Sequence, residues 1–464
     1  MRAAIAARRH GADVLVLDER AAPGGQIWRD VETPAFGDAR TLGDDYAHGA
    51  SLVAEFRSCG AQYRPGTLVW DVSRDRVLRI AGDPGAHSVE ATRIVVASGA
   101  IERPFPVPGW TLPGVVAAGG AQALLKSAAL VPAGPVVLAG TGALLLLLAW
   151  QYLRLGVPVA AVLETTPRGS AWRTAARLPG ALAAGGYVVK GLRMLHAIRS
   201  AGVMHLRGVQ ALRALGERRL ERVEYRAQGR DAAIDAQLLL LHQGVVPDVN
   251  LTMALGCAHD WDAGQLCLRP RTDAWGNTDV EGVALAGDGA GIAGAACAGL
   301  AGELAGLEAA HRLGHIGRAE RDRLAAAPRA ALARSLRVRP LLEALHRPRD
   351  DDRVPRGDDV VVCRCEEVRA GTVRAEIARG ATDPNAIKSR TRCGMGPCQG
   401  RYCGLTVTEM IAAARGMTPG AVGYFRIRPP IKPIPLADLL ALDRGEAPPE
   451  AALPGTRAQA PVHR

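Results

Sequence analysis

Lysine is scarce in this chain. Its 464 residues include 57 lysines and arginines, yet the only lysines are Lys126, Lys190, Lys388 and Lys432, so arginine carries almost all of the net charge of +11. The arginines are dispersed, and no nucleic-acid-binding motif accompanies them. A solvated surface of arginine-biased composition explains the charge, and nucleic acid is not expected as a partner. An anionic partner protein or membrane surface stays open as the alternative.

An export signal is also missing. The first ten residues contain no apolar core and no small-residue cleavage site, which together mark a secretory signal. The sequence therefore predicts a cytoplasmic protein, with peripheral association with the inner membrane as the alternative. The length leaves room for about three domains.

One uncharged stretch, residues 135–153, reaches the lower length limit of a transmembrane helix. Gly140-Thr-Gly142 divides it, so we expect a short buried strand at 136–139, a helix at 143–154 and a further strand at 157–163. Parallel strands that are buried on both faces read as continuous apolar runs. The stretch therefore predicts a βαβ unit rather than a membrane span.

Five of the nine cysteines gather in the last quarter, as Cys363-Arg-Cys365 and Cys393-Gly-Met-Gly-Pro-Cys398-Gln-Gly-Arg-Tyr-Cys403. Thiolates in close pairs can converge on one metal centre. Sulfur ligands select zinc, copper(I) or iron–sulfur clusters, and four thiolates hold a [2Fe–2S] cluster. Structural zinc sites usually use C-x2-4-C pairs. A C-x-C pair with a C-x4-C partner is less typical of zinc, so zinc and an empty site remain only as alternatives. The other four cysteines are expected to be buried thiols.

The N-terminus has the pattern of a βαβ unit whose front is absent. We expect a helix at 3–10 and a strand at 14–17 that stops at Asp18-Glu19-Arg20. An acid that ends the second strand of such a unit hydrogen-bonds a ribose. The G-x-G-x-x-G turn that normally precedes the helix is not in the sequence. We therefore expect the first strand and glycine turn to be missing, flavin to bind weakly, and an upstream start codon to be the simplest explanation.

Three further segments follow in a fixed order. Residues 93–100 predict a strand that runs into Ser98-Gly99, residues 103–109 a stiff proline-rich crossover, and residues 278–289 a strand that ends in Gly287-Asp288. With the N-terminal unit, these resemble the glutathione-reductase-like flavoproteins, which have two dinucleotide-binding domains. The resemblance implies FAD, with Glu19 at the adenosine ribose and Asp288 at the ribityl and phosphate region. The remaining residues assigned to this site are Arg20, Gly25, Gln26, Val69, Ser98, Gly99 and Gly287.

A second nucleotide turn is expected at Gly140-Thr-Gly142, with Glu164 at the end of its second strand. Leu145 stands where the third glycine of the motif permits close packing of helix on strand. Two interpretations stay open: a site for a second adenine nucleotide, NAD or ATP, or a retained fold without a ligand. No Cys-x-x-Cys accompanies the flavin motifs, which argues against a disulfide reductase.

The C-terminal cysteine run resembles the ferredoxin-like [2Fe–2S] domain of bacterioferritin-associated ferredoxin. The resemblance implies Cys363, Cys365, Cys398 and Cys403 as ligands and leaves Cys393 outside the set. Segments 241–247, 272–278, 287–292 and 423–433 resemble the alpha subunits of bacterial opine oxidases, D-hydroxyproline dehydrogenase, dye-linked proline dehydrogenase and hydrogen cyanide synthase.

This family resemblance implies an α/β fold with two Rossmann-like domains and a small helical [2Fe–2S] domain. It also implies a complex in which the beta subunit, an amine-oxidising flavoprotein, acts on the substrate while the alpha subunit relays electrons. A respiratory electron acceptor and a small third subunit are further expected partners. A self-sufficient NAD(P)H-dependent reductase and a non-catalytic scaffold are the alternatives.

No pair of acid–base residues stands out, so no catalytic residue is assigned, and His242 and His259 are expected to be ordinary hydrogen-bonded histidines. We expect a disordered tail over roughly the last 20 residues. The expected domains are an FAD-binding domain (1–125 and 246–338), a second nucleotide-binding domain (126–245), a linker (339–358), a [2Fe–2S] domain (359–420) and a C-terminal extension and tail (421–464).

Overall fold

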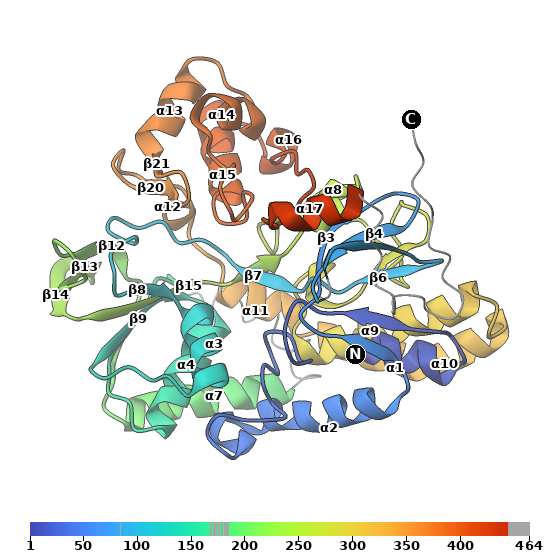
Figure 1. Cartoon of the computed structure of the whole chain (residues 1–464). Helices are drawn as coiled ribbons and strands as arrows, with labels where there is room; N and C mark the ends of the chain where they lie inside the picture. Colours follow the sequence, from blue (N-terminus) through green and yellow to red (C-terminus); the bar gives the residue numbers. More distant parts are fainter. Residues whose placement is uncertain are drawn as a thin grey trace.

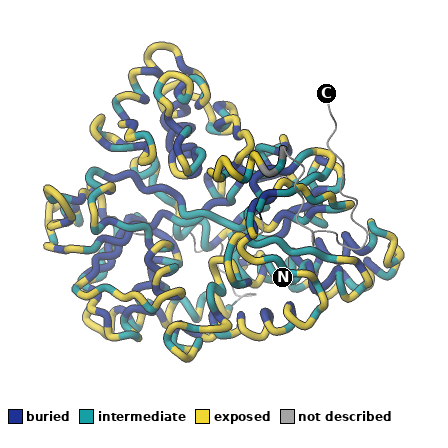
Figure 2. The backbone as a smooth tube through the Cα atoms, in the orientation of Figure 1, coloured by how far each residue is buried: buried dark blue, intermediate teal, exposed yellow. Residues whose placement is uncertain are grey.

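The computed structural model describes residues 1–83, 85–167, 169, 174, 177, 180 and 185–443. The expected disordered tail lies outside these residues. Two α/β parts lie side by side, and a small helical domain sits over the junction between them (Figure 1). The buried segments run through the centre of each part (Figure 2).

One α/β part is built on a five-stranded parallel sheet in the order β11-β10-β9-β15-β8. Successive residues of β9 alternate between two cores: Val136 and Leu138 face helices α3 and α4, whereas Val137 and Ala139 face the antiparallel sheet β12-β13-β14. The elements are β8 (Val115–Ala117), α3 (Ala118–Ala128), β9 (Val136–Thr141), α4 (Ala143–Arg154), β10 (Val159–Glu164), α7 (Gly185–Ser200), β11 (Met204–Arg207), β12 (Gln210–Leu215), β13 (Arg222–Ala227), β14 (Arg230–Asp235) and β15 (Leu238–Gln243).

The apolar stretch at 135–153 forms β9, a glycine turn and α4, as the sequence predicts. Every residue of β9 is buried, which explains its continuous hydrophobicity. Among the described residues, no helix has the length and apolar character needed to cross a membrane.

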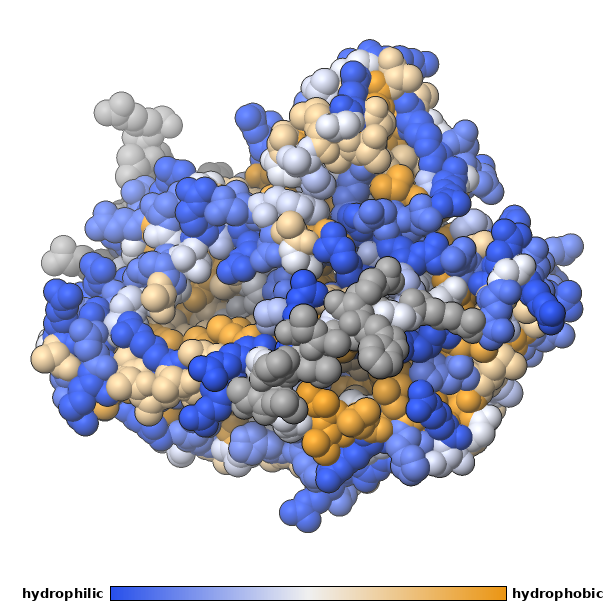
Figure 3. All heavy atoms as spheres, turned by 180° about the vertical axis from the view of Figure 1, so that it is seen from behind, coloured by the Kyte–Doolittle hydropathy of each residue, from blue (hydrophilic) through white to orange (hydrophobic). Residues whose placement is uncertain are grey.

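The outer surface mixes polar and apolar side chains. Seen from behind, hydrophilic residues cover much of the molecule, and apolar patches lie between them (Figure 3). Helix α7 contributes three large apolar side chains that are exposed, Tyr187, Val189 and Leu192. Apolar side chains on a protein surface are common, because there is not enough polar surface to cover a folded chain.

The other α/β part contains the two ends of the predicted flavin fold. Its parallel strands pair as two separate two-stranded sheets, β1 with β2 and β6 with β19. The elements before the crossover are α1 (Arg2–Arg9), β1 (Leu15–Leu17), η1 (Ala39–Leu42), α2 (Asp44–Ser58), β2 (Gln62–Arg64), the antiparallel sheet β3 (Leu68–Val72), β4 (Val77–Ala81) and β5 (His87–Glu90), then β6 (Ile94–Val96) and β7 (Ala100–Glu102).

The chain leaves this part through β7 and returns through β16, which pair antiparallel. After the return come β16 (Val245–Pro247), α8 (Asn250–Ala254), β17 (His259–Asp262), β18 (Cys267–Pro270), β19 (Val283–Leu285), η3 (Gly287–Gly289), α9 (Ala295–Arg312), α10 (Arg318–Leu336), α11 (Arg339–Leu345) and α12 (Asp350–Arg353).

Small residues on α9 bring α1 close to it. A Cβ added at Gly306 would lie 2.4 Å from the carbonyl oxygen of Ala3, and one at Gly302 would lie 3.3 Å from the Ala3 nitrogen. Any larger side chain at 306 would push the helices apart. The small-residue helix that follows Gly287-Asp288 in the sequence therefore serves as the packing surface for the N-terminal helix.

The helical domain has its own core, made by residues such as Val373, Ile387, Val407 and Ile411. Phe425, Ile427 and Ile431 from the segment after α16 complete that core. Its elements are β20 (Val361–Cys363), β21 (Val368–Arg369), α13 (Ala370–Ala378), α14 (Pro384–Thr391), α15 (Gly404–Arg415), α16 (Pro419–Val422) and α17 (Leu436–Asp443).

A buried charge cluster holds the helical domain on the rest of the molecule. Glu409 on α15 contacts Arg353 on α12, and its carboxylate lies 4.0 Å from Arg103 in the crossover. Both the Glu409 and Arg103 side chains are 4% exposed. Arg103 also donates to the carbonyl oxygens of Gln265 and Leu266, at 2.9 and 2.7 Å. The three segments can keep these charges out of water only while they stay together.

Replacing Glu409 with alanine should therefore destabilise the protein strongly. Removing one partner of a buried ion pair leaves the other charge uncompensated, at a cost of about 3–5 kcal/mol. Denaturant unfolding followed by circular dichroism measures the loss. Glu320→Ala removes an exposed carboxylate paired with Arg323 on the surface and should leave the unfolding midpoint unchanged. Equal midpoints for the two variants would contradict the assigned role of Glu409.

Candidate functional site

The structure gathers the five C-terminal cysteines. Cys363 ends β20, Cys393 follows α14 and Cys403 precedes α15, and their three sulfur atoms lie within 4.8 Å of one another. All three are buried. Cys365 and Cys398 form a second, more exposed pair of neighbouring thiols. The four predicted ligands therefore lie in one group of five thiols. Cys393, which the family resemblance leaves out of the ligand set, lies in the buried half of this group.

Glycines let the cysteine loops approach. A Cβ at Gly396 would lie 2.2 Å from the Cβ of Cys365, so a side chain there would separate the two loops. Gly394 and Gly400 have φ angles of 87° and 80° and pack against the Phe425 ring. The Gly-Met-Gly-Pro run is thus explained by close packing around the cysteines.

The electrostatics of the buried trio favour a thiolate. Hydrogen bonds from the Cys393 and Cys403 thiols lower the pKa of Cys363 to about 2. A thiolate is the form that binds metal, and a donor set made only of sulfur suits a soft metal or an iron–sulfur cluster. These residues fit the predicted cluster.

The cysteine loop is joined through Asp248 to the α/β part that contains β6 and β19. Arg401, between Cys398 and Cys403, places its Nε 3.1 Å from an Asp248 carboxylate oxygen. The backbone N–H of Asp248 donates to the carbonyl oxygen of Gly99 at 3.0 Å, and the Ser98 hydroxyl donates to the Asp248 carbonyl oxygen at 2.9 Å. One residue therefore links the cysteine loop to the Ser98–Gly99 turn.

Four of the predicted flavin residues meet at one sheet edge. Because β6 and β19 are parallel neighbours, Ser98 and Gly99 emerge beside Gly287 and Asp288. Asp288 Oδ1 accepts hydrogen bonds from the backbone N–H groups of Ala293 and Gly294, both at 2.9 Å. Gly99 has a φ of 69°, and a Cβ added there would meet nothing within 4 Å. This open cradle beside an anchored carboxylate fits a flavin.

The predicted ribose acid lies at the end of the other two-stranded sheet. Glu19 follows β1 and forms an ion pair with Lys432 of the C-terminal extension. Arg20 donates its backbone N–H to Asp18, and Val69 lies in β3. Lys432 is not part of a recognisable motif. Its partner lies more than 400 positions away, so the sequence around Lys432 could not predict the pair.

Lys126 organises the loop that contains Gly25 and Gln26. Its ammonium group donates to the carbonyl oxygens of Gln26 and Ile27, at 3.0 and 2.9 Å. Burial lowers the pKa of Lys126 to about 8. Gly25 has a φ of 58° beside open space. The scarcity of lysine, together with the apolar surroundings of Lys126, is the signal that could have identified it.

In the α/β part built on the five-stranded sheet, the glycine turn packs closely against His242. A Cβ at Gly140 would lie 1.7 Å from the His242 carbonyl oxygen, and one at Gly142 would lie 2.7 Å from the His242 ring. That ring is held by Glu102 Oε1 at 2.5 Å from His242 Nδ1. Leu145 is fully buried in the adjacent core. Packing inside the protein therefore explains the residue type at each of these three positions.

The predicted strand-end acid of this part is also engaged. Glu164 Oε2 lies 3.1 Å from His205 Nε2 and 3.0 Å from Arg207 Nε, and the Glu164 side chain is 5% exposed. The other singled-out histidine, His259, hydrogen-bonds to Thr252 and to the Cys257 carbonyl oxygen. Both histidines named from the sequence are thus hydrogen-bonded structural residues.

The charged segment expected as a linker crosses the carboxyl edge of this sheet. Gln243 donates to the Asp352 carbonyl oxygen at 3.1 Å, and Arg349 donates to the Val209 carbonyl oxygen at 3.2 Å. Burial raises the pKa of Asp352 to about 6 and lowers the pKa of His346 to about 4. Both groups therefore tend toward their neutral forms at this edge.

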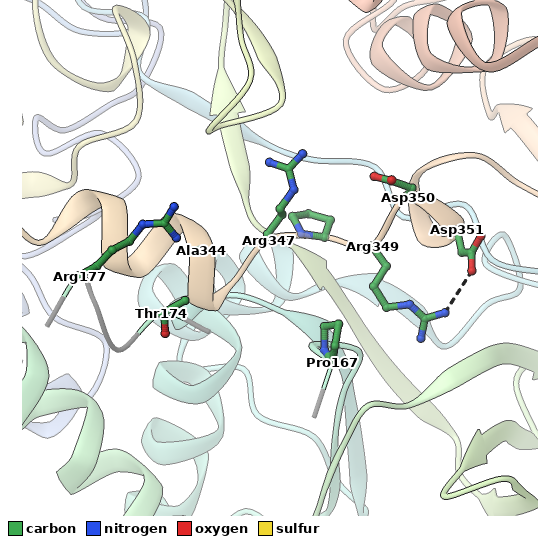
Figure 4. Close-up of a pocket in the computed structure, with 9 residues that line it drawn as sticks. Pro167, Thr174, Arg177, Ala344, Arg347, Arg349, Asp350 and Asp351 are labelled. Atoms are coloured by element: carbon green, nitrogen blue, oxygen red, sulfur yellow. Dashed lines mark hydrogen bonds and ion pairs between the residues drawn. The ribbon is translucent and has the colours of Figure 1, made fainter. Parts of the chain in front are cut away.

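A cleft of about 550 Å³ lies beside the same segment (Figure 4). Arg347, Arg349, Asp350 and Asp351 line it from the segment, with Arg177 across from them. Arg349 and Asp351 pair at 3.5 Å. The mixed charges give the cleft no clear preference for an anion.

Comparison with known proteins agrees with this arrangement. Residues 1–312 match the family described as pyridine nucleotide-disulphide oxidoreductase, and residues 361–413 match the BFD-like [2Fe-2S] binding domain. The chain is 42% identical over 456 residues to the opine oxidase A subunit of Agrobacterium tumefaciens (strain Ach5), a match that covers 95% of this chain and 89% of that protein. The chain belongs to the family of opine oxidase A subunits. The resemblance inferred from the sequence motifs is confirmed.

More distant relatives extend the comparison. The chain is 32% identical to hydrogen cyanide synthase subunit HcnB of Pseudomonas aeruginosa, with 94% of this chain and 95% of that protein covered. The structure of L-proline dehydrogenase from P. horikoshii superposes with a TM-score of 0.70 at 20% identity, covering 94% of this chain and 76% of that one. The predicted α/β flavoprotein fold with a C-terminal [2Fe–2S] domain is confirmed for this family member.

Arg401→Ala tests the link between the cysteine loop and Asp248. A hydrogen bond to a charged group contributes about 1.5–3 kcal/mol, so local opening of residues 246–252 and 398–403 should become roughly tenfold or more faster by hydrogen exchange. Arg392→Ala removes a more exposed arginine that pairs with Glu366 inside the helical domain and is the matched control. Unchanged exchange in Arg401→Ala would show that Asp248 does not fasten the loop.

Proposed function

We propose that this chain is the alpha subunit of a flavin-dependent complex that oxidises a C–N bond of an amino acid or opine. In this proposal it relays electrons between flavin and a [2Fe–2S] cluster. The observation that carries the proposal is the bonding of Asp248 to both the cysteine loop and the Ser98–Gly99 turn. The names of the relatives, opine oxidase and hydrogen cyanide synthase subunits, support the substrate class and the multi-subunit assembly.

The chain's own residues have defined tasks in this proposal. Ser98, Gly99, Gly287 and Asp288 would hold the ribityl and phosphate region of FAD, and Glu19 the adenosine ribose. Cys363, Cys365, Cys398 and Cys403 would hold the cluster. Flavin bound there would supply the exchange between two-electron and one-electron chemistry. Arg401 and Asp248 keep the two sites in register, and the packing of Leu405 against Val246 and Cys267 excludes water between them.

Oxidation of the amine belongs to a partner in this scheme. Taking hydride from a C–N bond calls for a positioned base or a neutral amine near the flavin. The acids close to the Ser98–Gly99 turn, Asp248 and Asp288, are each bonded within the chain. We therefore expect an amine-oxidising flavoprotein as the beta subunit, with a respiratory acceptor and a small third subunit completing the path. A cytoplasmic location, with or without peripheral contact with the inner membrane, suits such a relay.

We further propose that the second nucleotide-type domain is retained as a structural element without NAD or ATP. The internal contacts of its glycine turn support this, because the close approach of His242 already explains why Gly140 and Gly142 carry no side chain. Glu164 is engaged by His205 and Arg207, and the 346–352 segment covers the strand ends where nucleotides bind in such folds. This proposal disfavours a self-sufficient NAD(P)H-dependent reductase.

Co-expression with the beta partner tests the relay. The isolated chain should not oxidise proline, hydroxyproline or opines, whereas the complex should pass electrons from one of these amines to an artificial dye. Asp248→Asn in the complex should slow reduction of the cluster without changing substrate reduction of the partner's flavin. Asparagine keeps an Oδ1 acceptor for the Asn250 N–H but loses the charge that pairs with Arg401. Amine turnover by the isolated chain would overturn the division of roles.

Nucleotide titration tests the second domain. A ligand that binds the folded state at 100 times its Kd stabilises it by about 2.7 kcal/mol, a shift that thermal melts resolve easily. NAD, NADP and ATP at millimolar concentration should leave the melting temperature unchanged, and NADH should not bleach the flavin. A higher melting temperature with either ATP or NAD would refute the proposal that this domain has only a structural role. Rapid bleaching by NADH would favour the reductase instead.

A further inference from the structure

The five thiols of the cluster region divide into two unequal groups. The inner group is Cys363, Cys393 and Cys403, which are 1%, 0% and 1% exposed. The outer group is Cys365, which is exposed, and Cys398, which is half-buried. Because the three inner sulfurs lie within 4.8 Å of one another, any two of them can bind the same metal ion. The outer group offers only two sulfurs.

A [2Fe–2S] cluster takes four thiolates, two on each iron. By this division, Cys363 and Cys403 would hold an inner iron, and Cys365 and Cys398 would hold an outer iron. The inner iron then has three thiols for two positions. This division rests on the proposed presence of the cluster, but it adds an asymmetry that neither the cysteine spacing nor the family match contains.

The local structure fixes Cys393 in this place. Its backbone N–H donates to the Thr391 hydroxyl at 3.2 Å. The preceding residue, Arg392, caps α14 in the left-handed conformation with a φ of 63°. The following residue, Gly394, has a φ of 87°, and a Cβ there would lie 2.8 Å from the Phe425 ring. Cys393 is fully buried, and its sulfur lies within 4.8 Å of the Cys363 and Cys403 sulfurs.

We propose that Cys393 is a third thiol of the inner iron. In the intact protein its S–H donates a hydrogen bond to the ligating sulfurs, which stabilises the reduced, more negative cluster. If Cys403 or Cys363 were removed, Cys393 would lose its thiol proton to water and its sulfur would take the vacant ligand position. No electron is gained or lost in this exchange. The outer iron has no such replacement.

Alanine variants test this asymmetry, because alanine cannot itself bind iron. In anaerobically purified protein we expect about two irons per chain in the wild type and in Cys403→Ala, the latter with altered EPR g values. The Cys403→Ala/Cys393→Ala double variant and Cys398→Ala should both lose the cluster. Flavin content and circular dichroism check that each variant is folded.

The single variant Cys393→Ala gives a second readout that does not depend on ligand loss. It should retain about two irons but have a lower reduction potential in a redox titration, because one donor to the sulfurs is gone. Loss of iron in Cys403→Ala to the same extent as in Cys398→Ala, or an unchanged potential in Cys393→Ala, would overturn the proposal. A wild-type protein without iron would instead overturn the proposed cluster itself.

Discussion

The ion pair between Arg401 and Asp248 is the contact on which the arrangement of the two sites depends. Arg401 is confined between two cluster cysteines, and the backbone of Asp248 is hydrogen-bonded to the Ser98–Gly99 turn. Both side chains are largely buried, so neither charge can be left without its partner. The pair therefore joins the loop that contains Cys398 and Cys403 to the strand end at Ser98–Gly99, although the two residues lie 153 positions apart in the sequence.

The Gly140-Thr-Gly142 turn shows how much a nucleotide-binding motif can predict. A Gly-x-Gly turn reports that something approaches the backbone closely, but it does not say what. In this chain the approaching groups are the His242 carbonyl oxygen and imidazole ring, held by Glu102. Leu145 in place of the third glycine then packs as an ordinary core residue. If no nucleotide binds here, as proposed, the glycine turn serves close internal packing instead of a ligand.

The elements that could be predicted from the sequence are those indicated by residues close together in the chain. The βαβ unit at 136–164, the strand ends at Ser98 and Asp288 and the paired cysteines all follow from spacing and periodicity over a few residues. The sequence did not predict the pairs of Arg401 with Asp248, Lys432 with Glu19, or Glu409 with Arg103. These pairs join distant segments, and one arginine among many carries no mark of its partner. The family resemblance leaves Cys393 out of the ligand set, whereas the fold places its sulfur beside those of Cys363 and Cys403.

The contacts of the buried carboxylates are relevant to how tasks would be divided in the proposed complex. An acid–base catalyst needs an ionisable group that is free to exchange a proton with substrate. Glu409 joins the helical domain to the crossover, Asp248 fastens the cysteine loop, Glu164 is paired inside its sheet edge, and Glu102 holds His242. Acids at the junctions of the described chain are thus committed to holding parts together. In the proposed complex, this chain would hold two redox sites in place while a partner handles the protons of the amine.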